Sequence, residues 1–116
     1  MARSLKHEVV IIGGGSAGIA TASSMLKRRP SLNIAIVEPS EDHYYQPGWT
    51  MVGGGVFEAS TTKRTTASVM PKQATWLKTA AASFQPENNQ VTLSDGATIT
   101  YRLLIVAPGI RLAWEK

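Results

Sequence analysis

Three glycines follow a short apolar run and precede a stretch with helical spacing. They stand at positions 13, 15 and 18 and spell G-x-G-x-x-G. The run before them, VVII at residues 9–12, is typical of a strand that is buried on both faces of a parallel sheet. Residues 16–29 carry apolar side chains on one side of a helix, and Pro30 ends that helix because a proline disfavours helical backbone in the residue before it. The glycines therefore form the turn between a strand and a helix.

A second apolar run, IAIV at residues 34–37, follows this helix and ends at Glu38. Strand, glycine turn, helix and strand in this order make a βαβ unit. The acid stands twenty residues after Gly18, where a dinucleotide-binding fold carries the carboxylate that binds the adenosine ribose. A carboxylate there repels a 2′-phosphate, which favours FAD or NAD over NADP. Strand, helix and acid together favour dinucleotide binding over a glycine-rich turn without a ligand.

Each residue of the turn has a physical role in such a site. Gly13 permits the tight turn, Gly15 lets pyrophosphate oxygens approach the backbone, and Gly18 lets helix and sheet pack closely. The helix start at Ser16 and Ala17 presents unpaired N–H groups and the positive end of the helix dipole to the phosphates. We therefore expect the phosphates to bind at the start of the helix.

The second half of the chain has the pattern of strands and turns. Residues 75–84 predict one strand, and residues 90–93 and 98–101 predict a hairpin around the Asp-Gly pair at 95–96. Residues 103–107 predict a final buried strand. We therefore expect an α/β fold, a Rossmann-like βαβ domain with a parallel sheet and an inserted β-hairpin or meander.

Less regular segments connect these two halves. Residues 39–47 are polar and aromatic and predict a loop, and residues 61–70 predict a short helix. The glycines at 53–55 predict a flexible turn rather than a second copy of the motif, because position 58 is Glu58 and no strand precedes them. His43 has no nucleophile or acid partner near it in the sequence, which favours a structural role in its loop over catalysis.

Composition excludes several functions. The chain contains no cysteine, so disulfides, thiolate metal sites and thiol catalysis are excluded within it. The net charge is +4, but the basic residues are scattered and form no stripe with aromatic residues, which argues against nucleic-acid binding. No apolar run approaches the roughly 20 residues that span a bilayer. Glycines interrupt the one early run that could pass for a signal peptide, so we expect no signal peptide.

The layout is similar to that of flavoproteins with two dinucleotide-binding domains. An NAD domain usually continues with alternating helices and strands, whereas this chain inserts a β-rich stretch. It then returns to a strand that ends in Ala107-Pro108-Gly109, where these flavoproteins carry a second glycine-bearing motif, often A-T-G, that closes the flavin site. Proline at 108 removes the hydroxyl contact of that threonine. The resemblance favours FAD over NAD.

Three longer blocks resemble the sulfide:quinone oxidoreductases, in particular their mitochondrial-like branch, within the FAD-dependent pyridine nucleotide-disulfide oxidoreductase superfamily. The blocks are EPSEDHYYQPGWTMVGGG at residues 38–55, RTTASVMP at 64–71 and YRLLIVAPGIRLAWEK at 101–116. The similarity spans almost the whole chain and is far more specific than the glycine pattern.

This resemblance implies a set of cofactor contacts. The matching positions that would touch FAD are Ser16, Ala17, Glu38 and Gln46. Ala81 would offer a backbone contact to the adenine, by its place in the strand after Trp76. Gly109 would lie beside the phosphate and ribitol of the flavin.

The resemblance also implies an activity. Such enzymes oxidise sulfide to a sulfane-sulfur product and pass two electrons through FAD to a membrane quinone, with the help of a cysteine pair. Because this chain has no cysteine and full members are much longer, we expect residues 1–116 to be the N-terminal part of an FAD-binding domain, inactive alone and without a catalytic residue, with residues 114–116 leading into a linker. Quinone and sulfide would bind through segments absent here. The full-length protein would be cytoplasmic or peripheral to the inner membrane and could form a homo-oligomer.

Two alternatives stay open at this point. A type II NADH:quinone oxidoreductase shares the first glycine motif, but it needs a second glycine fingerprint for NADH and no cysteine pair. Both differences would lie beyond residue 116. A stand-alone nucleotide-binding module without catalysis would need little more than the βαβ unit.

Overall fold

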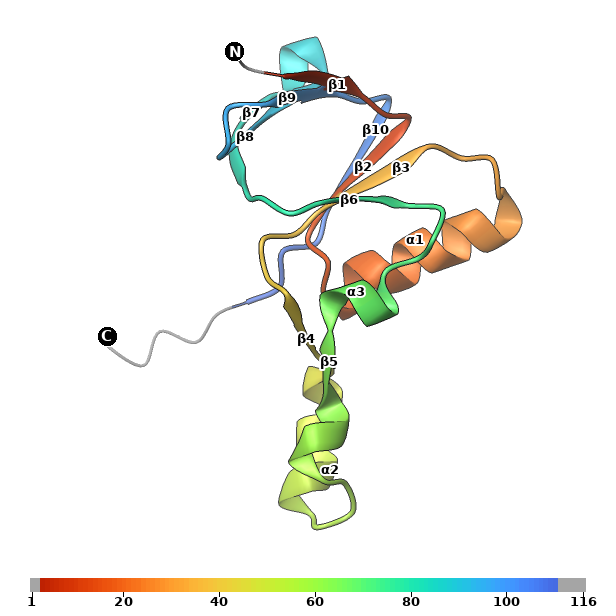
Figure 1. The fold of residues 1–116 in the computed structure, drawn as a ribbon, viewed down its shortest axis with the longest axis vertical. Coiled ribbons are helices and arrows are strands. Elements are labelled where there is room, and N and C mark those ends of the chain that lie inside the picture. The colour runs from red at the N-terminus through yellow and green to blue at the C-terminus, as the bar shows by residue number, and fades with distance from the viewer. Residues whose placement is uncertain (1–2, 111–116) are drawn as a thin grey trace.

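The structure is a computed structural model that describes residues 3–110 (Figure 1). The predicted start of a linker at residues 114–116 lies outside the described residues. The helices and strands are, in chain order, β1 (Ser4–Lys6), β2 (Val9–Ile12), α1 (Ser16–Arg28), β3 (Ile34–Val37), β4 (Asp42–Tyr44), α2 (Trp49–Gly53), β5 (Lys63–Thr65), α3 (Thr66–Val69), β6 (Thr75–Leu77), β7 (Ala81–Gln85), β8 (Gln90–Leu93), β9 (Thr98–Thr100) and β10 (Leu103–Val106). Short 3₁₀ helices span Gln46–Gly48, Ala59–Thr62 and Pro86–Asn88.

Four parallel strands form the central sheet, in the order β10, β2, β3, β6. β2 and β3 are the strands of the predicted βαβ unit, α1 connects them, and Val9 lies between Leu103 and Ile34 in the register. Every residue of β2 and β3 is buried, which explains why both strands are continuous apolar runs rather than alternating ones. The predicted α/β class with a parallel sheet is confirmed.

A second sheet has the strand order β1, β9, β8, β7. Its β8–β9 hairpin forms as predicted, with Gly96 at φ +90°, a backbone region that glycine enters without a steric penalty. The Asp95 carboxylate accepts hydrogen bonds from the Ala97 N–H at 3.0 Å and from the Arg3 guanidinium at 2.9 Å. β1 pairs in parallel with β9 and was not predicted, because a strand of three residues with exposed ends leaves no pattern in the sequence.

Two apolar cores lie on opposite faces of the central sheet, because successive side chains of a strand point to opposite faces. The first core joins central-sheet and second-sheet residues: Val10, Ile12, Ala35, Val37, Val91, Leu93, Ala97, Ile99 and Tyr101. The second joins central-sheet residues to α1: Val9, Ile11, Ala22, Leu26, Ile34 and Ile36. The helix thus covers one face of the central sheet and the second sheet covers the other (Figure 1).

The predicted strand at residues 75–84 is wrong, because the structure divides it between the two sheets. β6 pairs with β3 in the central sheet, whereas β7 pairs with β8 in the second sheet. Residues 78–80 carry the chain from one sheet to the other. The segment contains no glycine or proline, so its sequence gives no sign of the break.

The predictions for residues 39–47 and 61–70 are wrong in part. The expected loop contains β4, which pairs antiparallel with β5, and the expected helix is confined to the single turn of α3. The two strands form the stem of a narrow arm that extends from the α/β body, with α2 toward its tip (Figure 1). Their partners are distant in the sequence, so local patterns do not reveal the pairing.

The final predicted strand, at residues 103–107, is confirmed as β10, but it is not fully buried. β10 lies at the edge of the central sheet, and its Leu103 and Val106 are 49% and 56% exposed. The prediction of a buried strand is wrong in this respect: Leu104 and Ile105 pack against the two cores on opposite faces of the sheet, but the strand lies at the edge and is only partly covered by residues 3–110.

Candidate functional site

The glycine turn between β2 and α1 is built on contacts that only glycine allows. Gly13 has φ +110°, and a Cβ at this position would lie 2.0 Å from the carbonyl oxygen of Ala107, just after β10. A Cβ at Gly18 would lie 1.8 Å from the carbonyl oxygen of Gly13. Gly13 therefore brings the turn against the end of β10, and Gly18 brings α1 against the turn.

Gly15, by contrast, faces open space. Apart from its two neighbours in the chain, no part of residues 3–110 lies within 4 Å of the position that its Cβ would occupy. Gly15 immediately precedes α1, no side chain caps this helix, and its first turn carries no acidic residue. The first N–H groups of a helix lack intrahelical partners, and the helix dipole makes this end positive. The open space at Gly15 is therefore suited to an anion.

Glu38 follows β3, and its carboxylate reaches back to the glycine turn. Oε1 accepts a hydrogen bond from the Gly14 N–H at 2.8 Å, and Oε2 accepts one from the Ser40 N–H at 2.9 Å. The backbone of Glu38 is also fixed, because the Trp76 indole donates to its carbonyl at 2.9 Å and its N–H donates to the Leu77 carbonyl at 3.0 Å. A carboxylate has about four acceptor positions. Glu38 therefore keeps acceptors for the hydroxyl groups of a ligand.

His43 contacts the same turn from the arm. The residue is half-buried on β4, and its Nδ1 lies 3.2 Å from the carbonyl oxygen of Gly14. The sequence favoured a structural role for His43 within its own loop. The structure places its ring on the glycine turn, a long-range contact that the sequence does not reveal.

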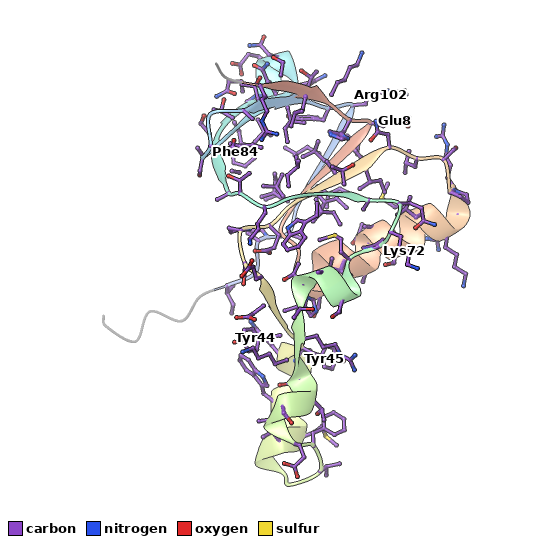
Figure 2. The ribbon with its side chains drawn as sticks, in the orientation of Figure 1. Glu8, Tyr44, Tyr45, Lys72, Phe84 and Arg102 are labelled. Atoms are coloured by element: carbon purple, nitrogen blue, oxygen red, sulfur yellow. The ribbon has the colours of Figure 1, made fainter. Side chains whose placement is uncertain are left out.

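A cavity of about 300 Å³ opens at the start of α1. We call it the helix-end cavity. The predicted site residues that line it are Gly15, Ser16, Ala17, Glu38, Gln46 and Gly109. Tyr44 and Pro47, at the base of the arm, line it as well, and so does Pro108. Figure 2 shows Tyr44 and Tyr45 on opposite sides of the arm, and of the two only Tyr44 lines this cavity.

A second cavity, of about 390 Å³, lies between the central sheet and the second sheet. We call it the inter-sheet cavity. Its walls include Gly13 after β2, Val106 of β10, and Ala81 and Phe84 of β7. Most of the lining side chains are apolar, and Glu38 lines this cavity as well as the helix-end cavity. The carboxylate therefore lies where the start of α1 meets an apolar compartment.

All predicted site residues except Gly18 line one of the two cavities. Gly18 is buried and acts through the close packing of α1 on the turn. The cavity residues Tyr44, Pro47 and Phe84 were not predicted from the sequence. Tyr44 and Pro47 lie within two residues of the predicted Gln46. Gly14 was also missed, and its place within three consecutive glycines was the available signal.

A larger cavity, of about 460 Å³, is a different site at the far end of α1. It is lined by residues that include Met25, Arg28 and Leu103, and none of the predicted site residues lines it. Glu8 and Arg102 close one side, with charged atoms 3.9 Å apart (Figure 2). It lacks the glycine backbone and the helix N-terminus that suit an anion. We therefore do not choose it as the candidate site, although its volume exceeds those of the helix-end and inter-sheet cavities.

The helix-end cavity and the inter-sheet cavity together suit a ligand that carries three kinds of chemical group. The start of α1 suits phosphate, the Glu38 carboxylate suits sugar hydroxyls, and the inter-sheet cavity suits a flat apolar ring. Within residues 3–110 no cluster of three or more His, Cys, Asp or Glu side chains could bind a metal ion. No helix of this described part is long and apolar enough to cross a membrane.

Comparison with known proteins finds relatives that share one name, mitochondrial sulfide:quinone oxidoreductase. Mitochondrial sulfide:quinone oxidoreductase of Mus musculus is 46% identical over 110 residues, which are 95% of this chain and 24% of the relative. The enzyme of the same name from Dictyostelium discoideum is 44% identical over 117 residues, 98% of this chain and 26% of the relative. The chain therefore spans about a quarter of the length of these curated relatives.

A solved structure has the same fold. The sulfide:quinone oxidoreductase of Aquifex aeolicus superposes with a TM-score of 0.78 at 29% identity, over 97% of this chain and 26% of the enzyme. The predicted resemblance is confirmed by these relatives, and FAD is the cofactor that the family supports.

The sequence profile of one family covers nearly the whole chain, both cavities included. It is described as pyridine nucleotide-disulphide oxidoreductase and matches residues 7–113. The chain belongs to the pyridine nucleotide-disulphide oxidoreductase family.

Proposed function

We propose that this chain is the FAD-binding part of a sulfide:quinone oxidoreductase. One observation carries the proposal: the open backbone at Gly15 and the carboxylate of Glu38 line the same cavity, at the start of a helix that no side chain caps. The identity to the mitochondrial enzymes from mouse and Dictyostelium supports the choice of reaction.

In this proposal the residues of the two cavities bind successive parts of the cofactor. Backbone N–H groups at Gly15, Ser16 and Ala17 hold the pyrophosphate, because they combine free donors with the helix dipole. The Glu38 carboxylate accepts hydrogen bonds from the adenosine ribose. Ala81 and the inter-sheet cavity receive the adenine. This assignment requires no change in the turn, since the space at Gly15 is already open.

Other residues extend the proposed site toward the flavin. Gln46 and Gly109 line the helix-end cavity from opposite parts of the chain, the base of the arm and the segment after β10. Gly13 and Gly18 contribute by shaping the turn. When bound, FAD supplies the two-electron chemistry that links sulfide oxidation to quinone reduction.

We further propose that residues 1–116 are the N-terminal part of a longer FAD-binding domain. The chain has no cysteine, so the thiols of a sulfide-oxidising enzyme would belong to another part of the polypeptide. Sulfide and quinone would bind there too, together with any peripheral contact to the inner membrane and any contact between subunits. The proposed role of this part is to hold the cofactor.

The test is made on the full-length protein that contains this chain. We expect the purified protein to show flavin absorbance, sulfide to bleach it, and an added quinone to restore it. Bleaching by NADH but not by sulfide would instead support a type II NADH:quinone oxidoreductase. A protein that is free of flavin and cannot be loaded with FAD would contradict both enzyme functions and favour a stand-alone nucleotide-binding module.

A further inference from the structure

Gly14 is hydrogen-bonded on both sides. Its N–H donates to Glu38 Oε1 at 2.8 Å, and its carbonyl oxygen lies 3.2 Å from His43 Nδ1. A carbonyl oxygen can only accept, so in this contact Nδ1 carries the proton and donates it. One side chain thus comes from the end of β3 and the other from β4.

The position of His43 is fixed by its own strand and by the start of α3. On β4 it lies opposite Arg64 of β5. Thr66, the first residue of α3, is fully buried, and it anchors the segment before β4. Its hydroxyl donates to the Ser40 carbonyl at 2.9 Å and its N–H donates to the Glu41 carbonyl at 2.8 Å. The imidazole is therefore brought to Gly14 by a braced element rather than by a free loop.

The carbonyl that His43 contacts belongs to the peptide group whose N–H is that of Gly15. In a planar trans peptide the C=O and N–H bonds point in opposite directions. Fixing the Gly14 carbonyl toward His43 therefore turns the Gly15 N–H away from the His43 ring. Gly15 lines the helix-end cavity, and its N–H has no hydrogen-bond partner within residues 3–110.

We propose that His43 is a positioning residue for the anion-binding turn, and that its hydrogen bond to the Gly14 carbonyl orients the Gly15 N–H for the pyrophosphate of the cofactor. This inference rests on the proposed FAD-binding function. His43 itself does not contact the phosphates. It acts through the peptide group between Gly14 and Gly15, while Glu38 holds the preceding peptide group.

The test compares three replacements of His43 in the full-length protein after its flavin is removed. His43→Asn keeps an N–H donor at about the position of Nδ1, His43→Gln moves the donor one bond farther out, and His43→Leu removes it. The affinity of each apoprotein for FAD is measured by titration. The ³¹P resonances of bound FAD report on the pyrophosphate separately from activity.

The net value of one hydrogen bond, about 0.5–1.5 kcal/mol, corresponds to a roughly 2- to 12-fold change in affinity. We expect His43→Leu and His43→Gln to weaken FAD binding within this range and to shift a pyrophosphate resonance. His43→Asn should bind FAD within about twofold of the wild-type protein. The matched control is His7→Leu, which removes the other histidine of the chain and its contact to Asn33 at 2.7 Å, and should leave FAD affinity unchanged.

Two results would overturn the proposal. One is wild-type affinity and unshifted resonances in all three variants. The other is equal loss in all three, which would mean that the ring shape and not the donor is required. If His43→Leu does not fold, the comparison of His43→Asn with His43→Gln decides the question. A wild-type protein that binds no FAD would contradict the proposed function itself, which is a different outcome from either of these.

Discussion

The carboxylate of Glu38 and the main-chain N–H of Gly14 meet at 2.8 Å and tie the end of β3 to the turn after β2. A Cβ on residue 14 would lie 2.8 Å from the Cβ of Glu38, closer than real side chains approach. The contact therefore requires glycine at position 14. The acid that we propose to hold the ribose thus also shapes the turn that we propose to hold the pyrophosphate.

Replacing Glu38 by alanine should lower FAD occupancy in the full-length protein. The change removes the acceptor for the ribose and the acceptors for the Gly14 and Ser40 N–H groups. Hydrogen bonds to a charged group are worth about 1.5–3 kcal/mol, so affinity should fall roughly 12- to 160-fold. Flavin content per protein and titration of the apoprotein measure the effect. Equal flavin content in Glu38→Ala and wild-type protein would show that the ribose assignment is wrong.

Replacing Gly15 by valine should separate folding from cofactor binding. The side chain would enter open space, so the unfolding temperature of the apoprotein should change little. It would occupy the volume proposed for the pyrophosphate, so FAD binding should be lost. Gly53→Val is the matched control, because Gly53 also has no atom within 4 Å of its Cβ position but lies on the arm at the end of α2. Normal flavin loading of Gly15→Val would remove the case for close backbone approach.

Replacing Gly18 by alanine should destabilise the fold itself. The new Cβ would lie 1.8 Å from the Gly13 carbonyl oxygen, so α1 must move away from the turn. Overpacking of this kind costs about 1–3 kcal/mol. Denaturant unfolding of the apoprotein should show this loss, whereas Gly15→Ala should not. Unchanged stability of Gly18→Ala would mean that α1 can shift freely on the central sheet.

The turn at Asp95 should contribute stability that depends on pH. The Ala97 N–H and then the Arg3 guanidinium lower the pKa of the Asp95 carboxyl below its usual value. A group with a lowered folded-state pKa stabilises the fold above its unfolded pKa, and the contribution is lost as pH falls through the folded pKa. Unfolding measured from neutral pH to about pH 3 should therefore show a smaller acid-induced loss in Asp95→Asn than in wild type. The same pH slope in both proteins would assign the acid sensitivity to other carboxylates.

The βαβ unit and the glycine turn could be predicted because their signals are local. Two apolar runs, three spaced glycines and one acid all lie within residues 9–38. The β8–β9 hairpin was equally accessible, since the Asp95-Gly96 pair fixes its turn. Residues 75–84 show the limit of this reasoning. Their strand pattern is real, but the change of partner from β3 to β8 depends on the rest of the fold.

The candidate site could be predicted where the residue type itself points to a backbone requirement. Gly13 and Gly15 are such positions, because glycine allows the tight turn and leaves the backbone accessible. Gln46, Ala81 and Gly109 required the resemblance to a known family, because nothing in their own spacing points to a ligand. The contact of His43 with Gly14 could be predicted neither from residue type and spacing nor from the family resemblance. It depends on the pairing of β4 with β5, which joins segments that are about twenty residues apart.

Short covalent connections bind the two sheets to each other. The chain passes between them at residues 7–8, 78–80 and 101–102, where each link has only two or three residues. A residue extends by at most about 3.6 Å, so each link limits how far apart the strands that it joins can lie. Residues 78–80 adjoin the inter-sheet cavity, since Ala80 lines it, whereas residues 7–8 and 101–102 precede β2 and β10, at the opposite ends of these strands. Substitutions in the lining can therefore change the shape of this cavity, while the link at residues 78–80 keeps its two walls joined through the chain.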